Sequence, residues 1–270
     1  MLPATSPDSF IRLCEELIVN GAQGILLSGG SNHQNEVEYT PYLPQIEKLK
    51  TKYPEFQIAI HTALVDDVMA LRLDSSGIDV AMFDLIGAQD TITQVYHLKR
   101  QVDDFENTLL SLRKTSMKVV PHIVIGLHYG NLLGEWNALE MVARHGADAL
   151  ILVVVMPQYA RPSRPFITPA PEQVGQFFLD ARQRLPHMPV MLGCARPPGY
   201  DKVILDSYAV MAGLDGIAHP SEGIVALAEK LNRYIDVSAS CCSINDVDII
   251  SGHYQPDDRH IINEQRIKWK

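Results

Sequence analysis

Short apolar strands alternate with amphipathic helices along most of this chain of 270 residues. The longest apolar run, residues 149–156, has the length of a strand that is buried on both of its faces. We expect strands at residues 24–28, 57–62, 78–86, 118–127, 149–156, 189–193 and 216–218. Strands that alternate with helices and are apolar on both faces are typical of a parallel sheet, so the sequence predicts an α/β fold.

The helices that we expect fill the intervals between these strands, and one precedes the first strand. The first helix opens at Pro7 behind Ser6 and ends at Asn20 and Gly21. The others are expected near residues 42–52, 66–73, 92–114 (in one or two pieces), 135–145, 172–184, 201–212 and 223–234, the last capped by Ser221. Such regular units predict a parallel (β/α) TIM-type barrel over residues 1–242, followed by a polar tail over residues 243–270.

The chain opens on a helix, so this barrel lacks its first strand and the loop that follows it. We interpret this as a start that lies inside a longer protein. The alternative is a sheet whose edge is left open.

Composition excludes two classes of partner. The net charge of −9 offers no basic surface for nucleic acid, and no apolar run approaches the roughly 20 residues of a membrane span. The adjacent Cys241 and Cys242 are poorly placed to form a disulfide with each other. Cys14 lies on the first helix, and we expect it to pack in the protein core. Thiols or metal ligands in a cytoplasmic protein fit this cysteine usage better than secretion.

The first strand ends in Leu26-Leu-Ser-Gly-Gly30, which puts bare backbone at the carboxyl end of a parallel strand. Ligand-binding residues of barrels lie at these ends. The other strand ends carry His61, Asp84, His122 to His128, Cys194 to Arg196 and His219. His122 and His128 are an even number of residues apart, which predicts that both point into the barrel if the strand continues.

Taken together, these residues resemble the radical S-adenosylmethionine (SAM) enzymes, in particular the branch that contains biotin synthase. Ser28, Gly29 and Gly30 look like the family's GG motif, which implies that their backbone meets the amino group of SAM and that the two glycine amides are open to the cavity. The resemblance implies a ribose contact for Asp84. It also implies an adenine-binding strand over 122–126, so His122, Val124 and Gly126 are expected cofactor-binding residues.

The match is most similar to archaeal-type two-component lipoyl synthases, on four runs of sequence. These runs are Phe83-Asp-Leu-Ile-Gly87, Pro121-His-Ile-Val-Ile-Gly-Leu-His128, Leu192-Gly-Cys-Ala-Arg-Pro197 and Cys241-Cys242. The resemblance implies sulfur insertion into an octanoyl group, with a 4Fe–4S cluster and SAM as cofactors. It implies a small-molecule or carrier-protein-bound acyl substrate, an electron donor such as ferredoxin and a second radical SAM subunit as partners.

The sequence departs from the family in one respect, because it contains no CxxxCxxC motif. In the family, this motif holds the cluster that binds SAM, and it follows the strand that is also missing here. The chain as given is therefore not expected to cleave SAM reductively. The resemblance further implies an auxiliary cluster held by Cys194, Cys241 and Cys242, and substrate contacts from His61, His128 and Arg196.

Two alternatives stay open at this point. The chain could be a SAM-binding partner subunit without redox chemistry of its own, or an unrelated (β/α)-barrel enzyme such as an aldolase. An aldolase uses a lysine that forms a Schiff base, and none of the expected strand ends carries one.

Overall fold

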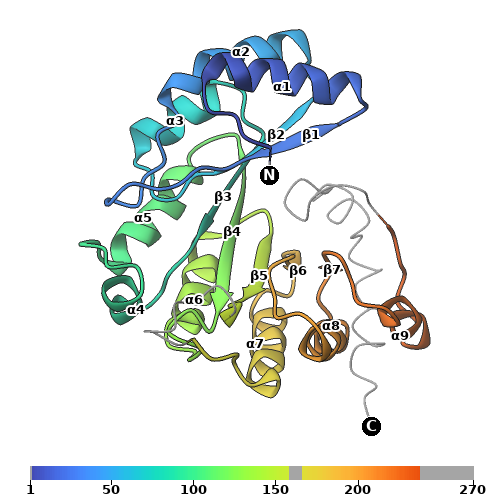
Figure 1. Cartoon of the computed structure of the whole chain (residues 1–270). Coiled ribbons are helices and arrows are strands. Elements are labelled where there is room, and N and C mark those ends of the chain that lie inside the picture. The colour runs from blue at the N-terminus through green and yellow to red at the C-terminus, as the bar shows by residue number, and fades with distance from the viewer. Residues whose placement is uncertain (1, 158–165, 238–270) are drawn as a thin grey trace.

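A curled sheet of seven parallel strands, in the order β1-β2-β3-β4-β5-β6-β7, forms the framework of the molecule (Figure 1). The computed structural model describes residues 2–157 and 166–237. The strands are β1 (Gly24–Leu27), β2 (Gln57–His61), β3 (Val80–Asp84), β4 (Lys118–Ile125), β5 (Leu150–Val154), β6 (Val190–Leu192) and β7 (Gly216–Ile217). Each strand pairs in parallel with the next one along the chain. The predicted fold class is therefore confirmed: this is a half-barrel of the TIM type that lacks a strand.

Helices cover the outer face of the curled sheet (Figure 1). They are α1 (Pro7–Val19), α2 (Leu43–Lys52), α3 (Asp67–Ser75), α4 (Gln89–Gln94), α5 (Val102–Leu112), α6 (Glu135–His145), α7 (Pro171–Arg184), α8 (Tyr200–Ala212) and α9 (Ile224–Lys230), with a short 3-10 helix at Thr40–Tyr42. The long helix expected over 92–114 is divided into α4 and α5, one of the two forms that we allowed for it.

The two faces of the sheet bury different sets of side chains. Ile58, Ile60 and Phe83 point outward into the large core that the helices complete. Their neighbours along the strands belong to a smaller cluster on the inner face, formed by Ala59, Val80, Met82, Val120, Ala149, Ile151 and Met191. This two-residue alternation, with both faces apolar, is the reason that the strands appear as nearly continuous apolar runs in the sequence.

Helix α1 begins as the sequence predicts, with Ser6 as its cap and Pro7 as its first residue. Ser6 and Ser9 form a capping box around Pro7, with the Ser9 amide donating to Ser6 Oγ at 3.2 Å. Cys14 packs in the core with 1% of its surface exposed, as expected. Burial, with a smaller contribution from the charge of Glu15, raises the pKa of its thiol to about 11.

The predicted cap of the last helix is wrong. The residue that precedes α9 is Gly223, whose φ of 86° is left-handed, and no side chain caps this end. Ser221 instead donates from both its amide and its hydroxyl to the buried carboxylate of Asp206. Ser221 therefore pairs with a charged group, which forms stronger hydrogen bonds, and does not cap the helix.

No helix among the described residues is long and apolar enough to cross a membrane. Cys241, Cys242 and the polar tail over 243–270 lie outside the described residues.

Candidate functional site

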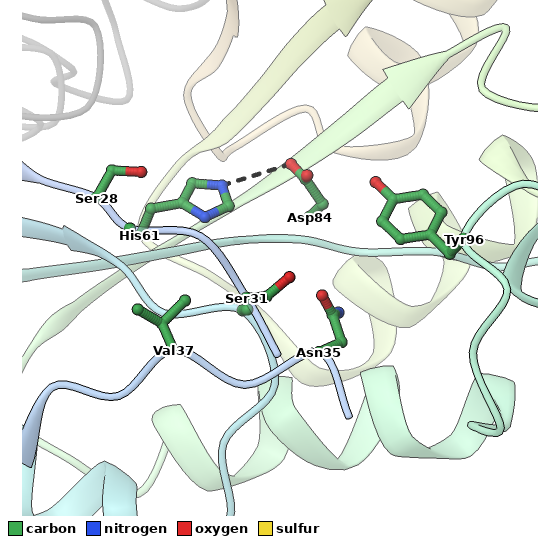
Figure 2. Close-up of a pocket in the computed structure, with 9 residues that line it drawn as sticks. Ser28, Ser31, Asn35, Val37, His61, Asp84 and Tyr96 are labelled. Carbon is green, nitrogen blue, oxygen red and sulfur yellow. Dashed lines mark ion pairs between the residues drawn. The ribbon is translucent and has the colours of Figure 1, made fainter. Parts of the chain in front are cut away.

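The carboxyl ends of the strands open into two neighbouring cavities, and Asp84 at the end of β3 lines both of them. The first cavity has a volume of about 260 Å³, and its lining is polar and apolar in about equal parts (Figure 2). It is lined by Ser28, Gly29, Ser31, Asn35, Val37, His61, Ala63, Asp84 and Tyr96. Three residues predicted from strand ends — Ser28, His61 and Asp84 — thus come together in one cavity, as parallel barrels require.

An ion pair crosses the first cavity. His61 Nε2 lies 3.6 Å from Asp84 Oδ1, and roughly a third of each side chain is exposed, 29% and 33% respectively. Figure 2 shows the Asp84 carboxylate between the His61 ring and the hydroxyl of Tyr96. Burial raises the pKa of Asp84, but the hydrogen bonds with His61 and Tyr96 and the nearby charges of His61 and His122 lower it below its ordinary value overall. Asp84 is therefore a carboxylate at neutral pH.

Tyr96 is held in its protonated form by the same surroundings. Burial, together with the charge of Asp84 and a hydrogen bond to it, raises the pKa of the Tyr96 hydroxyl well above its usual range. Tyr96 therefore donates a hydrogen bond to Asp84, which occupies one side of that carboxylate.

His122 on β4 is a neutral imidazole in this structure. Burial is the main cause that lowers its pKa to about 4, and the charge of His61 adds to it, against opposing effects of Asp84 and the Val120 carbonyl. Its Nδ1 lies 3.2 Å from the carbonyl oxygen of Val120, which can only accept, so Nδ1 carries the proton. The His61 and His122 rings lie edge to face with centroids 5.9 Å apart.

The sequence predicts that both glycines after β1 present open backbone amides, and the structure differs at Gly29. The Gly29 backbone is hydrogen-bonded to the phenol oxygen of Tyr39, which itself donates to the His61 carbonyl at 2.7 Å. The Gly29 amide is therefore not open to the cavity, because the tyrosine takes it. Gly30 has no left-handed φ, and a side chain added there would meet nothing within 4 Å. The fold itself does not require glycine at position 30.

The second cavity has a volume of about 350 Å³ and is mainly apolar. It lies at the ends of β3 to β6 and is lined by Asp84, His122, Val124, Val153, Val154, Val155, Met156, Gly193, Cys194 and Ala195. Two of the expected cofactor-binding residues, His122 and Val124, face this space together with Cys194. The thiol of Cys194 is free and exposed, as expected of a residue at the rim.

Arg196 does not face either cavity, so its predicted contact with substrate is replaced by a structural role. Its side chain is fully buried and its Nε lies 2.5 Å from Asp206 Oδ1 on α8. Its remaining nitrogens donate to the carbonyl oxygens of Gly193, Ala218 and His219. Arg196 thus ties the loops after β6 and β7 together, which fixes the chain on either side of Cys194.

The expectation that His122 and His128 share one face is also wrong. Strand β4 ends at Ile125, and Gly126 turns the chain with a φ of 79°, so the alternation stops before His128. His128 Nδ1 instead lies 3.2 Å from Thr91 Oγ1 at the start of α4.

Gly126, an expected cofactor-binding residue, is required by the fold. A side chain there would lie 2.2 Å from Pro169 Cγ, and its amide donates to Glu135 Oε1 at 2.8 Å. The other oxygen of Glu135 accepts from the amides of Leu133 and Gly134. Glu135 thus anchors the turn after β4 from the first residue of α6.

The described residues do not fit an iron–sulfur cluster. Such a cluster needs several thiolates, and the described cysteines are Cys14, buried in α1, and Cys194 at the rim. No group of three His, Cys, Asp or Glu residues in this part of the chain could hold a metal ion. We therefore assign no reaction step to a cluster.

Sequence reasoning missed three polar residues that line the first cavity. Ser31 and Asn35 belong to the loop after β1, and Tyr96 to the loop after α4. None lies at a strand end, and their only sequence signal is a polar loop of the kind that follows many strands.

The structure is similar to two solved structures at low sequence identity. The first is HydG, a maturase of the FeFe-hydrogenase, with a TM-score of 0.58, 14% identity and coverage of 80% of this chain and 50% of HydG. The second is methylornithine synthase PylB, with a TM-score of 0.54, 12% identity and coverage of 94% of this chain and 75% of PylB. This chain therefore spans half the length of HydG. No protein-family model matches the sequence, and no curated protein matches it. These likenesses show that the chain has a fold similar to those of HydG and PylB.

Proposed function

We propose that this chain is a radical SAM-type barrel that binds SAM across its two adjoining cavities. The observation that carries the proposal is the first cavity, in which the end of β1 at Ser28 and Gly29 lies opposite Asp84 on β3. HydG and PylB, which share this fold, are both radical SAM enzymes. The combined space falls within the usual range for cofactor sites, about 300–1,000 Å³.

Each cavity supplies a different part of this site. The amino-acid end of SAM is assigned to Ser28 and to the backbone of Gly29 and Gly30, apart from the Gly29 amide, which Tyr39 engages. The ionised Asp84 is assigned to the ribose hydroxyls. His122 and Val124 offer the adenine a neutral ring and an apolar surface in the second cavity. Gly126 acts indirectly, since it turns the chain beyond that surface.

The finer proposal is sulfur insertion into an octanoyl group, as in lipoyl synthesis. An apolar cavity beside an exposed thiol, Cys194, supports it, because an acyl chain needs apolar walls and a cluster needs soft ligands. Cys241 and Cys242 would supply further thiolates but lie outside the described residues. A carrier-bound acyl substrate, ferredoxin and a second radical SAM subunit are the partners of this reaction, in the cytoplasm.

Calorimetry with SAM tests the binding proposal. We expect Gly30→Val to abolish SAM binding while thermal unfolding stays unchanged, because the position is open to added atoms and carries no strain. Gly30→Ala, which adds a single methyl group, should weaken binding to a smaller extent. Equal SAM affinity in wild type and Gly30→Val would contradict the assignment. A wild-type chain that binds no SAM would favour the unrelated barrel enzyme.

Anaerobic reconstitution with iron and sulfide tests the finer proposal. The wild-type chain should bind a cluster, and Cys194→Ala or the Cys241/Cys242 double replacement should lose it. Equal iron content in all three proteins would remove the cluster. SAM binding without iron would then favour the partner subunit that lacks redox chemistry.

A further inference from the structure

Asn35 is one of the polar side chains in the first cavity that no protein group engages. Only 9% of the residue is exposed, and no hydrogen bond to its side-chain amide is made by the described residues. Figure 2 shows this amide directed into the cavity beside Ser31. The amide is not sealed off from solvent, because the buried side-chain atom without a partner among the described residues is Arg182 Nε. It reaches the cavity without a protein partner and is therefore available to a ligand there.

Hydrogen bonds set the backbone conformation around Asn35. Asn35 has a left-handed φ of 59°, its backbone amide donates to the Asn32 carbonyl at 3.0 Å, and its carbonyl accepts from the Leu64 amide at 2.9 Å. The Asn32 side chain accepts from the amides of Gln34 and Glu36. Asparagine tolerates this φ better than most residues. In this backbone conformation the side-chain amide of Asn35 faces the cavity.

Arg100, which lies between α4 and α5, forms hydrogen bonds with the same loop. Its Nε donates to the Gln34 carbonyl at 2.9 Å, and its Nη2 lies 2.6 Å from Glu36 Oε1. These contacts lie on either side of Asn35. We call this loop, which lines the first cavity with Ser31, Asn35 and Val37, the roof of the cavity.

The open groups of this cavity differ in charge. Asp84 supplies acceptor oxygens, which the hydrogen bonds with His61 and Tyr96 engage in part and which suit the hydroxyl groups of a ligand. Ser28, Ser31 and Asn35, by contrast, are uncharged, have no side-chain hydrogen bond among the described residues, and can all donate. They come from the end of β1 and its following loop. A carboxylate of a ligand can accept from these three groups, whereas the charge of Asp84 repels it.

We propose that Asn35 is a specificity residue that donates a hydrogen bond from Nδ2 to the carboxylate of the ligand. This inference rests on the proposed function in one respect, namely that the ligand is SAM and the carboxylate is that of its amino-acid end. It assigns to the loop after β1 the distinction between SAM and nucleosides that lack this carboxylate.

Calorimetry with SAM and with decarboxylated SAM, which differ only in the carboxylate, tests the assignment. The wild-type chain should bind SAM roughly tenfold or more tightly, the range of a hydrogen bond to a charged group. Asn35→Gly removes the amide and keeps the left-handed φ, and it should bind both ligands equally. Asn35→Asp should bind SAM more weakly than Asn35→Gly, because it places a like charge against the carboxylate.

The matched control is Asn232→Gly, which changes another left-handed asparagine, exposed near the end of α9. It should keep the wild-type preference for SAM. If Asn35→Gly also keeps that preference, the role of Asn35 is wrong while SAM binding itself stands.

A separate measurement decides the case in which the wild-type chain binds no SAM and the proposed function fails. The side-chain amide signal of Asn35 in NMR, assigned by its loss in Asn35→Gly, is followed during titration with L-methionine and with L-methioninol, which lacks the carboxylate. A shift with L-methionine alone supports carboxylate recognition. An unmoved signal, or equal shifts with both compounds, overturns it.

Discussion

The two cavities share Asp84 but are built in opposite ways. The first is roofed by a polar loop that exposed contacts hold, among them the pair between Arg100 and Glu36, whose side chains are 27% and 49% exposed. The wall of the second carries apolar side chains on strand ends, and the fully buried pair of Arg196 and Asp206 holds it. A buried network keeps one arrangement, whereas surface contacts can open at low cost. The polar end of a ligand therefore meets the more adaptable part of the site.

The largest expected effect comes from breaking the buried pair. Burial raises the pKa of Asp206, and hydrogen bonds with Arg196 and Ser221 hold it below its ordinary value. Arg196→Met removes the guanidinium and leaves the Asp206 carboxyl buried without its buried ion-pair partner. It also removes the Arg196 donor from the carbonyl oxygens of Gly193 and Ala218, whereas the His219 carbonyl still accepts from Lys202 Nζ at 2.6 Å. We expect the free energy of unfolding to fall by about 3–5 kcal/mol, measured by chemical denaturation.

The matched control for this variant is Arg184→Met, which breaks the exposed pair between Arg184 and Glu140. It should leave the denaturation midpoint where it is in the wild type, since exposed pairs contribute little. A similar loss of unfolding free energy in both variants would contradict the contrast between the buried ion pair and the exposed one.

A smaller effect is expected from His122, which lies where the two cavities meet. Its folded pKa of about 4 is below the value of roughly 6.5 in an unfolded chain. The unfolded state therefore takes up the proton first, and stability falls as the pH drops from about 6.5 to about 4, by roughly 3 kcal/mol in total.

His122→Gln keeps a neutral side chain that can donate to Val120 and does not titrate. Denaturation curves at pH 7 and pH 5 should therefore differ less in this variant than in the wild type. An identical dependence on pH in both proteins would show that His122 is not desolvated as the structure has it.

The framework of the fold was predictable from the sequence because its signals are local. Apolar strands separated by amphipathic helices follow from periods that any window of the chain shows, and helix α6 begins and ends at the residues expected. Strand ends moved by one or two residues because hydrogen bonding to the neighbouring strand decides them. Strand β5, expected over 149–156, pairs only over Leu150–Val154.

The site was only partly predictable, because loops and side-chain pairs depend on contacts between distant residues. Ser28, His61 and Asp84 were found since strand ends meet at one edge of a parallel sheet. Asn35 and Tyr96 were missed because nothing in a polar loop shows which residue turns inward. Arg196 was misassigned because its partner, Asp206, lies on the next helix, and a sequence does not show that an arginine is already paired.

The smallest expected effect concerns the roof of the first cavity. Arg100→Gln and Glu36→Gln, alone and combined, form a double-mutant cycle for the pair whose atoms are 2.6 Å apart. The local readout is hydrogen exchange of the Leu64 amide, which donates to the Asn35 carbonyl and is exposed when the roof opens. We expect a coupling of about 0.2–1 kcal/mol, because both side chains are partly solvated.

In 1 M salt the screening length shrinks to about 3 Å, so the coupling should largely disappear, whereas the loss of stability caused by Arg196→Met should persist. A roof coupling that survives high salt would mean that the loop is held as rigidly as the apolar wall, and the contrast between the two cavities would then be wrong.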